Sequence, residues 1–321
     1  MKKIITIVSG DPNSIGYEIL AKTWKRLKRE KRNNIVLIGS YLLIKKQLEK
    51  LKIRIPLYKI NSFDEMLSSK KLKVLDVPIK FTNPFKVKKE NIKKYILKCI
   101  EIGHNLSCDG KIAGFINLPI NKEIIFKNKN FGMTEYLAQK IKTNNTEVMM
   151  IYNKNFSVVP VTTHINIKDV SKTLNKSLIE KKIKTTNSFY KKIYNRKPII
   201  AVLGLNPHND ELRKKSEEKT IILPVIKKLK KDNFNIIGPF PADTIFLNKG
   251  KYKYDVIFGM YHDQVLAPFK SIYKYDAINI TLGLKYMRIS PDHGTGYDII
   301  GQGKANPLSL IKAIEFFKKF G

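Results

Sequence analysis

Histidine is rare in this sequence of 321 residues, and the positions of the histidines suggest a metal site. Three of the five, His164, His208 and His262, directly follow apolar stretches with the composition of buried strands. Imidazole is a common ligand of divalent transition metals, and three histidines with one open position make a catalytic site. The separations, 44 residues from 164 to 208 and 54 from 208 to 262, are too long for a local metal motif. The residues alone therefore leave two interpretations open: a shared metal, or three unrelated polar residues at strand ends.

Two further residues bear on this site. Asp263 follows His262, and its carboxylate could orient the imidazole or bind the metal itself. His104 lies in a stretch with a helical pattern, so we expect a structural or exposed position for it.

Three other residues are candidates for binding an anion. Thr134 lies in residues 132–135 at an expected helix start, where free backbone N–H groups attract phosphate. Lys270 and Arg288 flank an apolar strand at residues 278–280. Arg288 is one of only seven arginines, so the general abundance of lysine in this chain does not account for a basic residue at this position. The alternative to anion binding is that Arg288 forms an ion pair on the surface.

The common nucleotide-binding loops are absent from the sequence. The glycine pairs that start at Gly294 and Gly301 each lack the third glycine of Gly-x-Gly-x-x-Gly, and Gly303-Lys304 lacks the upstream glycine of a P-loop. A Rossmann fingerprint and a Walker A loop are therefore excluded, whereas binding of NAD by another kind of loop is not.

The elements that must position these residues alternate along the chain. Apolar strand-like runs separated by amphipathic helical stretches are typical of an α/β fold with a mostly parallel sheet. After about residue 110, polar clusters stand at the ends of these runs, where open α/β folds bind ligands. The predicted strands are residues 4–8, 34–39, 112–117, 147–152, 158–161, 199–203, 256–258 and 278–280. The predicted helices are residues 18–30, 41–51, 89–105, 169–190, 217–231 and 307–320.

Composition and charge narrow the class of protein. Hydrophobic residues make up 43% of the chain, which is globular composition, and no apolar run reaches the roughly 18 residues of a membrane span. The 61 basic and 27 acidic residues give a net charge of +34, which alone favours a nucleic-acid binder. Because only seven of the basic residues are arginine, we interpret the charge as a lysine bias of the surface and expect no nucleic-acid partner.

The cysteines and the N-terminus point to a cytosolic protein. Cys99 and Cys108 are too few for a disulfide framework or a four-cysteine zinc site. The first ten residues have a short apolar core after two lysines, which predicts a buried strand rather than a signal peptide. We expect no membrane partner.

Eight clusters of residues occur in order along nearly the whole chain, and together they are highly specific. They are residues 10–19 (GDPNSIGYEI), 118–123 (LPINKE), 132–137 (GMTEYL), 161–164 (VTTH), 204–208 (GLNPH), 238–244 (GPFPADT), 260–264 (MYHDQ), and 279–284 (NITLGL) with 292–295 (DHGT). In these clusters the chain resembles the 4-hydroxythreonine-4-phosphate dehydrogenase family of pyridoxal phosphate biosynthesis.

The resemblance implies a metal site and a dimer. A divalent metal, zinc, magnesium or cobalt, would be held by His164, His208 and His262. The family is a homodimer with each active site at the subunit interface, so one metal histidine would come from the partner chain. Asp243 lies in a family motif near the site and is a catalytic candidate without an assigned role; the general base is not identified.

The resemblance also implies a set of substrate contacts, with two departures from the family pattern. The family usually has histidine at position 133, and its replacement here removes a polar contact to substrate phosphate. After the histidine at 208 the family often has a glycine-rich loop, whereas residues 209–216 are charged here. The implied contacts are Met133, Thr134, Lys270, Asn279 and Arg288.

The implied fold is that of the isocitrate and isopropylmalate dehydrogenases: two α/β/α subdomains with a cleft between them. The first subdomain would comprise residues 1–125 plus 283–321, and the second, with the metal site, residues 126–282; we expect one structural unit overall. Residues 292–307 are similar to the adenosine-binding loop of that fold. NAD or NADP is therefore expected near His293, Gly294, Thr295 and Asp298.

The implied activity is NAD-dependent and metal-dependent oxidation of 4-phosphohydroxy-L-threonine at C3. Decarboxylation to 3-amino-2-oxopropyl phosphate would follow, as a step in pyridoxine 5'-phosphate biosynthesis. The first alternative is a dehydrogenase of a related phosphorylated hydroxy acid, such as 4-phosphoerythronate or 4-phosphothreonate. A phosphate acyltransferase would not need three strand-end histidines, and a nucleic-acid binding protein would explain none of the eight clusters.

Overall fold

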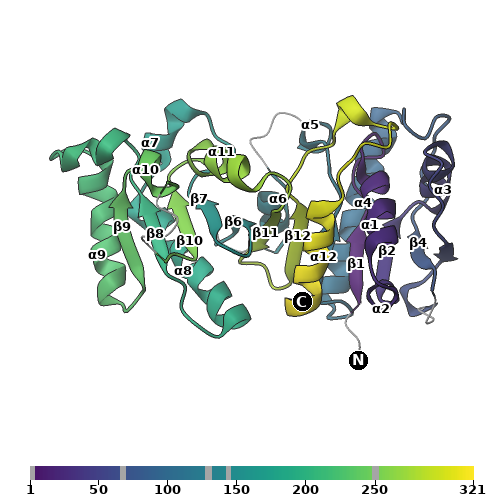
Figure 1. Ribbon diagram of the computed structural model, residues 1–321, viewed down its shortest axis with the longest axis horizontal. Coiled ribbons are helices and arrows are strands. Elements are labelled where there is room, and N and C mark those ends of the chain that lie inside the picture. Colours follow the sequence, from purple (N-terminus) through teal and green to yellow (C-terminus); the bar gives the residue numbers. More distant parts are fainter. Residues whose placement is uncertain (1–3, 66–69, 127–131, 142–145, 248–252) are drawn as a thin grey trace. The chain divides into compact units, whose positions relative to one another are not determined.

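Two compact α/β units make up the chain. The first unit comprises Met1–Lys129 and Lys285–Gly321, and the second comprises Asn130–Leu284. In each unit, helices pack on a mostly parallel sheet, as predicted (Figure 1). No helix in the described parts of the chain is long and apolar enough to cross a membrane. The computed structural model describes residues 4–65, 70–126, 132–141, 146–247 and 253–321.

The sheet of the first unit is parallel throughout its described strands, in the order β3-β4-β2-β1-β5-β12. Helix α4 packs on β1, β2 and β5, and α12 packs on β12 and β1. The carboxyl ends of β1, β5 and β12 therefore lie at one edge. The strands are β1 (Ile5–Val8), β2 (Ile35–Gly39), β3 (Leu57–Ile60), β4 (Leu72–Asp76), β5 (Gly114–Asn117) and β12 (Met287–Pro291). The helices are α1 (Gly16–Arg26), α2 (Arg29–Arg32), α3 (Tyr41–Lys50), α4 (Lys89–Cys108), α5 (Lys122–Phe126) and α12 (Leu308–Phe320).

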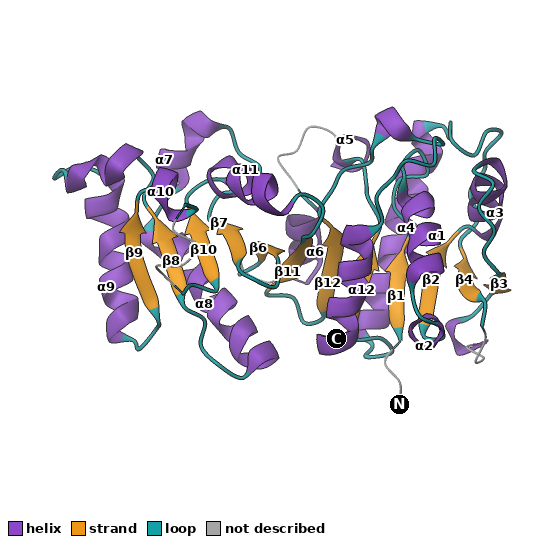
Figure 2. Ribbon diagram, in the orientation of Figure 1, coloured by secondary structure: helices purple, strands orange, loops and turns teal. Residues whose placement is uncertain are grey.

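The sheet of the second unit runs in the order β11-β6-β7-β10-β8-β9. Strands β7, β10, β8 and β9 are parallel and their arrows point the same way in Figure 2, whereas β6 is antiparallel to both of its neighbours. The strands are β6 (Val148–Tyr152), β7 (Ser157–Pro160), β8 (Ile200–Leu203), β9 (Ile236–Phe240), β10 (Val256–Gly259) and β11 (Ile278–Leu282). The helices are α6 (Met133–Ile141), α7 (Val170–Thr173), α8 (Lys176–Tyr194), α9 (Leu223–Lys231), α10 (Ala242–Ile245) and α11 (His262–Tyr273).

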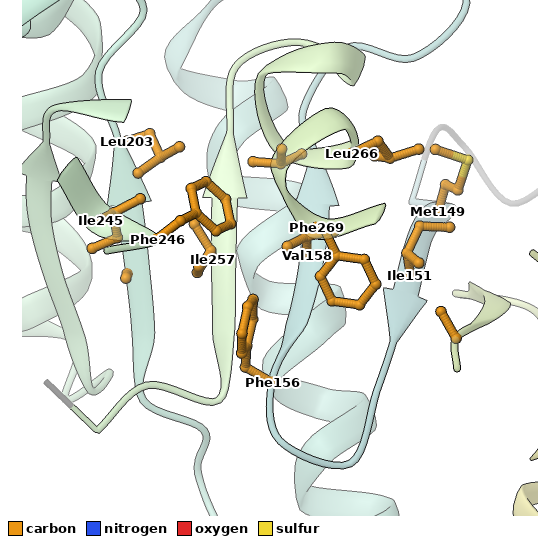
Figure 3. Close-up of a cluster of buried hydrophobic side chains, with 13 residues drawn as sticks. Met149, Ile151, Phe156, Val158, Leu203, Ile245, Phe246, Ile257, Leu266 and Phe269 are labelled. Atoms are coloured by element: carbon orange, nitrogen blue, oxygen red, sulfur yellow. The ribbon is translucent and has the colours of Figure 1, made fainter. Parts of the chain in front are cut away.

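A core of buried side chains fixes α11 on the sheet of the second unit (Figure 3). Val265, Leu266 and Phe269 of α11 lie in this core, and the ring of Phe156 packs edge-on against that of Phe269 with centroids 5.5 Å apart. Because α11 begins at His262, this packing also fixes the helix end that carries a predicted metal ligand.

Two differences between predicted and observed elements have a local cause. The predicted helix at residues 169–190 is interrupted, because the side chain of Asn175 accepts the Leu178 N–H at 2.9 Å and caps a new helix, α8. Strand β4 was not predicted, because Lys73 interrupts its apolar run. In the structure this lysine is buried, and its Nζ donates to the carbonyl oxygen of Asn33 at 2.7 Å.

Candidate active site

The three predicted metal histidines follow three adjacent parallel strands of the second unit. His164 comes after β7, His262 after β10 and His208 after β8. Strand β10 pairs with β7 on one side and with β8 on the other. The three carboxyl ends therefore lie side by side at one edge of the sheet, where α/β folds bind ligands.

Side-chain hydrogen bonds join these three strand ends. Thr162 Oγ1 donates to the carbonyl oxygen of Met260 at 2.8 Å, which ties the end of β7 to the end of β10. Gln264 accepts the Met260 N–H at 2.7 Å and donates to the carbonyl oxygen of Gly204 at 2.8 Å, which ties β10 to β8. These hydrogen bonds thus hold the three strand ends that carry the histidines in fixed positions relative to one another.

The structure brings two of the three histidines together. The ring centroids of His164 and His262 are 6.1 Å apart, with the planes tilted by 41°. Nδ1 of His262 lies 2.6 Å from a carboxylate oxygen of Asp263. A proton on Nδ1 facing that carboxylate leaves the lone pair of Nε2 available to a metal.

His208 is placed differently. It is exposed and lies in a short turn, Pro207–Leu212, where His208 has φ 51° and ψ 24°, the left-handed region. Among the described residues, no group of three or more His, Cys, Asp or Glu side chains lies close enough to hold a metal. Imidazole nitrogens with carboxylates beside them suit a divalent transition metal, so the donors fit, although the described residues do not bring all three histidines together.

Glu135 belongs to this site and was missed as a functional residue in the sequence. Its Oε1 lies 3.6 Å from Nδ1 of His164 and accepts a hydrogen bond from Thr163 Oγ1 at 2.9 Å. Burial raises the pKa of Glu135, but the interactions with His164 and Thr163 outweigh it and lower the pKa to about 2. The carboxylate is therefore charged beside His164.

The predicted substrate residues of the second unit lie on three elements. Met133 and Thr134 are buried at the start of α6, and Thr134 Oγ1 lies 3.0 Å from Thr281 Oγ1 on β11. Asn279 is two residues from Thr281, so both side chains point to one face of β11. The buried amide oxygen of Asn279 has no hydrogen-bond partner among the described residues, as expected of a group that awaits a ligand. Lys270 is exposed on α11.

Arg288 belongs to the first unit and is not a surface residue. It lies on β12, only 3% of it is exposed, and its Nε donates to Asn117 Oδ1 on the neighbouring strand β5 at 2.8 Å. The alternative of a surface ion pair is therefore wrong. His104, on α4, lies 2.8 Å from the hydroxyl of Tyr286, in a structural position as expected.

The predicted cofactor loop follows β12 and is held at the carboxyl edge of the first sheet. The carbonyl oxygen of Thr295 accepts the Ile15 N–H at 3.0 Å, and the hydroxyl of Tyr297 donates to Asp11 at 3.1 Å. Burial raises the pKa of Asp11, and the hydrogen bonds to its carboxylate only partly offset this.

The remaining cofactor residues line an open stretch of this loop. A Cβ on Gly294 would meet no atom within 4 Å, so the backbone there is accessible to a ligand. His293 is half-buried beside it, with Nδ1 3.1 Å from the Gly294 carbonyl oxygen, and Asp298 is exposed. The accessible glycine backbone and the exposed carboxylate are groups that could hold a nucleotide. Asp243 is exposed on α10 of the second unit, after β9.

Known proteins resemble the chain over nearly its full length. A 4-hydroxythreonine-4-phosphate dehydrogenase of Sulfurihydrogenibium sp. is 37% identical over 97% of this chain and 96% of its own. A D-threonate 4-phosphate dehydrogenase of Pectobacterium atrosepticum is 30% identical over 98% of each chain. The crystal structure of 4-hydroxythreonine-4-phosphate dehydrogenase from Klebsiella pneumoniae has a TM-score of 0.84 and 31% identity, covering 98% of each chain.

The fold and the family follow from these comparisons. A β-decarboxylating dehydrogenase from Thermococcus kodakarensis, with 12% identity and a TM-score of 0.50 over 98% of this chain and 82% of its own, shares the fold alone. The predicted α/β dehydrogenase fold is thus confirmed. The sequence model described as "Pyridoxal phosphate biosynthetic protein PdxA" matches residues 31–317. The chain therefore belongs to the pyridoxal phosphate biosynthetic protein PdxA family.

Proposed function

We propose that the chain oxidises 4-phosphohydroxy-L-threonine at C3, with NAD and a divalent metal, and that the product decarboxylates to 3-amino-2-oxopropyl phosphate. This is a step of pyridoxine 5'-phosphate biosynthesis. The observation that carries the proposal is the placement of His164, His262 and His208 after three adjacent parallel strands, in a member of this family. Relatives that match nearly the whole chain are named as dehydrogenases of phosphorylated hydroxy acids.

The three histidines would hold the metal. With its Nδ1–H donating a hydrogen bond to Asp263, His262 would present Nε2 to the metal, and Glu135 faces Nδ1 of His164 in the same way. A divalent metal bound there would supply a Lewis acid that lowers the pKa of the substrate's C3 hydroxyl and stabilises the alkoxide. The histidines and their carboxylates thereby orient C3 for loss of its hydride.

The substrate would be held through its anionic groups. Arg288 and Lys270 supply positive charge for phosphate and carboxylate, Thr134 supplies a hydroxyl, and Asn279 supplies an amide whose N–H groups can donate to an anion. NAD, bound near His293, Gly294, Thr295 and Asp298, would accept the hydride. Holding C3 in one orientation relative to the nicotinamide would raise the rate of hydride transfer, because binding has already fixed the geometry of the reacting atoms.

The test is production of NADH and CO2 from 4-phosphohydroxy-L-threonine by purified protein. We expect turnover with metal, loss of turnover with a chelator, and recovery when zinc, magnesium or cobalt is added back. Parallel assays with NADP determine the cofactor preference. Absence of NADH under all of these conditions would overturn the proposal.

A homodimer with shared sites is part of the proposal. Its support is that the described residues of one chain place only two of the three histidines together. The inactive variants His164→Ala, His208→Ala and His262→Ala are mixed in pairs after reversible dissociation. If the ligands of one site come from two chains, at least one mixture regains about a quarter of the activity, because half of the dimers contain one intact site. Activity in no mixture would contradict shared sites.

D-threonate 4-phosphate is a second candidate substrate. A relative with that named activity is 30% identical, and Met133, which is 3% exposed, offers the substrate phosphate no polar group where the family usually has histidine. The ratio of kcat/KM for the two substrates decides between them. If the replacement of the family's histidine by Met133 has removed a contact to the substrate phosphate, Met133→His should lower KM for the preferred phosphorylated substrate. The cytosolic location and the single structural unit stay predictions.

A further inference from the structure

We infer that Glu135 is a positioning residue that fixes the imidazole of His164 for metal binding. The inference rests on the proposed metal site. Glu135 lies 28 positions before Thr163 in the sequence, and none of the predicted ligands or substrate contacts includes it. Four observations on its surroundings carry the argument.

The first observation is that the start of α6 holds the carboxylate in place. The carbonyl oxygen of Gly132 accepts the Tyr136 N–H at 3.1 Å, which makes Gly132 the residue that caps the helix. Glu135 is the third residue of α6, and its Oε2 accepts the Gly132 N–H at 2.9 Å. This is the reciprocal bond of a capping box, and the positive end of the helix dipole favours the charged carboxylate there.

The second observation is that the other carboxylate oxygen faces the end of β7. Oε1 accepts the hydroxyl of Thr163 at 2.9 Å and lies 3.6 Å from Nδ1 of His164. With one oxygen bound to the helix and the other to Thr163, the carboxylate has no freedom to turn away from the imidazole. A proton on Nδ1 is favoured by this negative charge, and Nε2 then carries the lone pair that a metal needs.

The third observation is the close approach of Glu135 and His164 to the backbone at Gly132. A Cβ on Gly132 would lie 2.6 Å from Glu135 Oε2 and 2.6 Å from Cε1 of His164. The helix end, the carboxylate and the imidazole therefore lie next to one another around position 132.

The fourth observation is the repetition of the arrangement at the neighbouring histidine. His262 has the carboxylate of Asp263 at 2.6 Å from its Nδ1, as His164 has that of Glu135 at 3.6 Å. In both rings a carboxylate thus lies beside Nδ1, within hydrogen-bond distance at His262 and just beyond it at His164. The turn of α6 that holds Glu135 also carries Thr134, so one helix end positions a substrate contact and a metal ligand together.

The test separates positioning from folding with an isosteric variant. Glu135→Gln keeps an oxygen for the helix cap, since glutamine also serves in a capping box, but removes the charge that faces His164. Metal-free protein is titrated with Zn²⁺ against a chromophoric chelator, and with Co²⁺ to record its visible absorption. We expect Glu135→Gln to weaken metal binding about 10- to 100-fold and to shift the Co²⁺ spectrum. The melting temperature of the metal-free protein should also fall, because the charged carboxylate stabilises the start of α6, so the Co²⁺ spectrum of the folded variant is the readout that separates the two roles.

Two further variants complete the design. Glu180→Gln removes a carboxylate of the same unit that pairs with Lys184 and Lys228 on the surface, and it should leave metal affinity unchanged. Thr163→Val removes the hydroxyl that fixes Oε1 and should weaken metal binding, whereas Thr163→Ser should restore it.

The outcomes distinguish this inference from the proposed function. If the unmodified protein binds no metal, the proposed function fails. If it binds metal and Glu135→Gln binds it equally well with the same Co²⁺ spectrum, the positioning role alone is wrong. A loss of affinity that comes with a lower melting temperature but an unchanged Co²⁺ spectrum, and that Thr163→Val does not reproduce, also overturns the inference.

Discussion

His208 is a site residue with a left-handed backbone conformation. It opens a run of non-glycine residues with positive φ that continues to Leu212 at 54°. This conformation costs an L-residue about 1–2 kcal/mol and persists only where the surroundings hold it. Directly before the turn, the fully buried carboxylate of Glu218 accepts the N–H groups of Leu205 and Asn206 at 2.7 and 2.8 Å. Glu218 therefore fixes the backbone directly before the strained turn, and His208 in the turn is exposed to solvent.

The variant His208→Asn tests the role of that imidazole without changing the turn. Asparagine tolerates the left-handed conformation, so the free energy of unfolding of the metal-free protein should change by less than about 1 kcal/mol. We expect metal content to fall and kcat to drop at least about 100-fold, since a lost metal removes the Lewis acid. Metal analysis and turnover are measured on one preparation. Retention of both metal and turnover would show that His208 is not a ligand.

The burial of Arg288 leads to a prediction for substrate binding. Arg288→Ala removes a buried positive charge, whose Nε donates to Asn117 Oδ1, so KM for the phosphorylated substrate should rise at least about 10-fold. Arg288→Lys keeps the charge but not the planar donor set, and should give an intermediate KM. The control is Arg196→Ala, which removes an exposed arginine paired with Asp255 and should leave KM unchanged. An unchanged KM in Arg288→Ala would remove this residue from the substrate site.

The order of the strands decides which parts of the site the sequence could predict. Apolar runs predicted β7, β8 and β10, and with them the placement of each histidine at a strand end. The chain order 164, 208, 262 does not reveal that β10 inserts between β7 and β8, so that His262 becomes the neighbour of His164. Glu135 was missed for the same reason: a capping glutamate is visible in the sequence, but its contacts with Thr163 and His164 after β7 arise only when the chain folds.

Asp255 gives a prediction at the level of the strands, because it joins the segments that enter β8 and β10. Its carboxylate accepts the Ile199 N–H at 2.8 Å and pairs with Arg196. Burial raises the pKa of Asp255, but these hydrogen bonds outweigh it, so the pKa lies below its ordinary value. A carboxylate whose pKa is lowered on folding stabilises the folded state above its unfolded pKa of about 4, and this stabilisation is lost as the pH falls through the folded pKa.

Asp255→Asn should therefore lower the free energy of unfolding by about 1–2 kcal/mol at pH 7. The difference from the unmodified protein should shrink below about pH 4, where the carboxylate becomes protonated in the unmodified protein too. Urea unfolding at several pH values measures both quantities. Asp232→Asn, which changes an exposed aspartate after α9, is the control and should have little effect at any pH. A difference that is independent of pH would mean that the charge of Asp255 is not the cause.

For the whole molecule, composition alone favoured a class of protein other than the one that the family shows, whereas the scarce histidines and arginines indicated an enzyme. A net charge of +34 favours a nucleic-acid binder, yet the chain belongs to an enzyme family. Lysine is spread over exposed positions of many elements, whereas the rare residues His164, His262 and Arg288 lie at strand ends or in the sheet. Net charge constrains solubility and long-range attraction but not fold, so the fold class had to come from the periodicity of apolar runs.

The charge nevertheless has a measurable consequence for an enzyme whose proposed substrate and cofactor are both anions. A net charge of +34 raises the local concentration of anions, and added salt screens this field over a Debye length of about 10 Å at 0.1 M. We expect KM for the phosphorylated substrate to rise several-fold between about 20 mM and about 300 mM NaCl. The value of kcat should stay unchanged, because long-range electrostatic attraction affects binding of the substrate but not the reaction of bound substrate. Steady-state kinetics at a series of NaCl concentrations measure both constants, and phosphate and sulfate are avoided because they compete for the same groups. A KM that stays constant over this range would show that the lysine-rich surface does not gather the substrate.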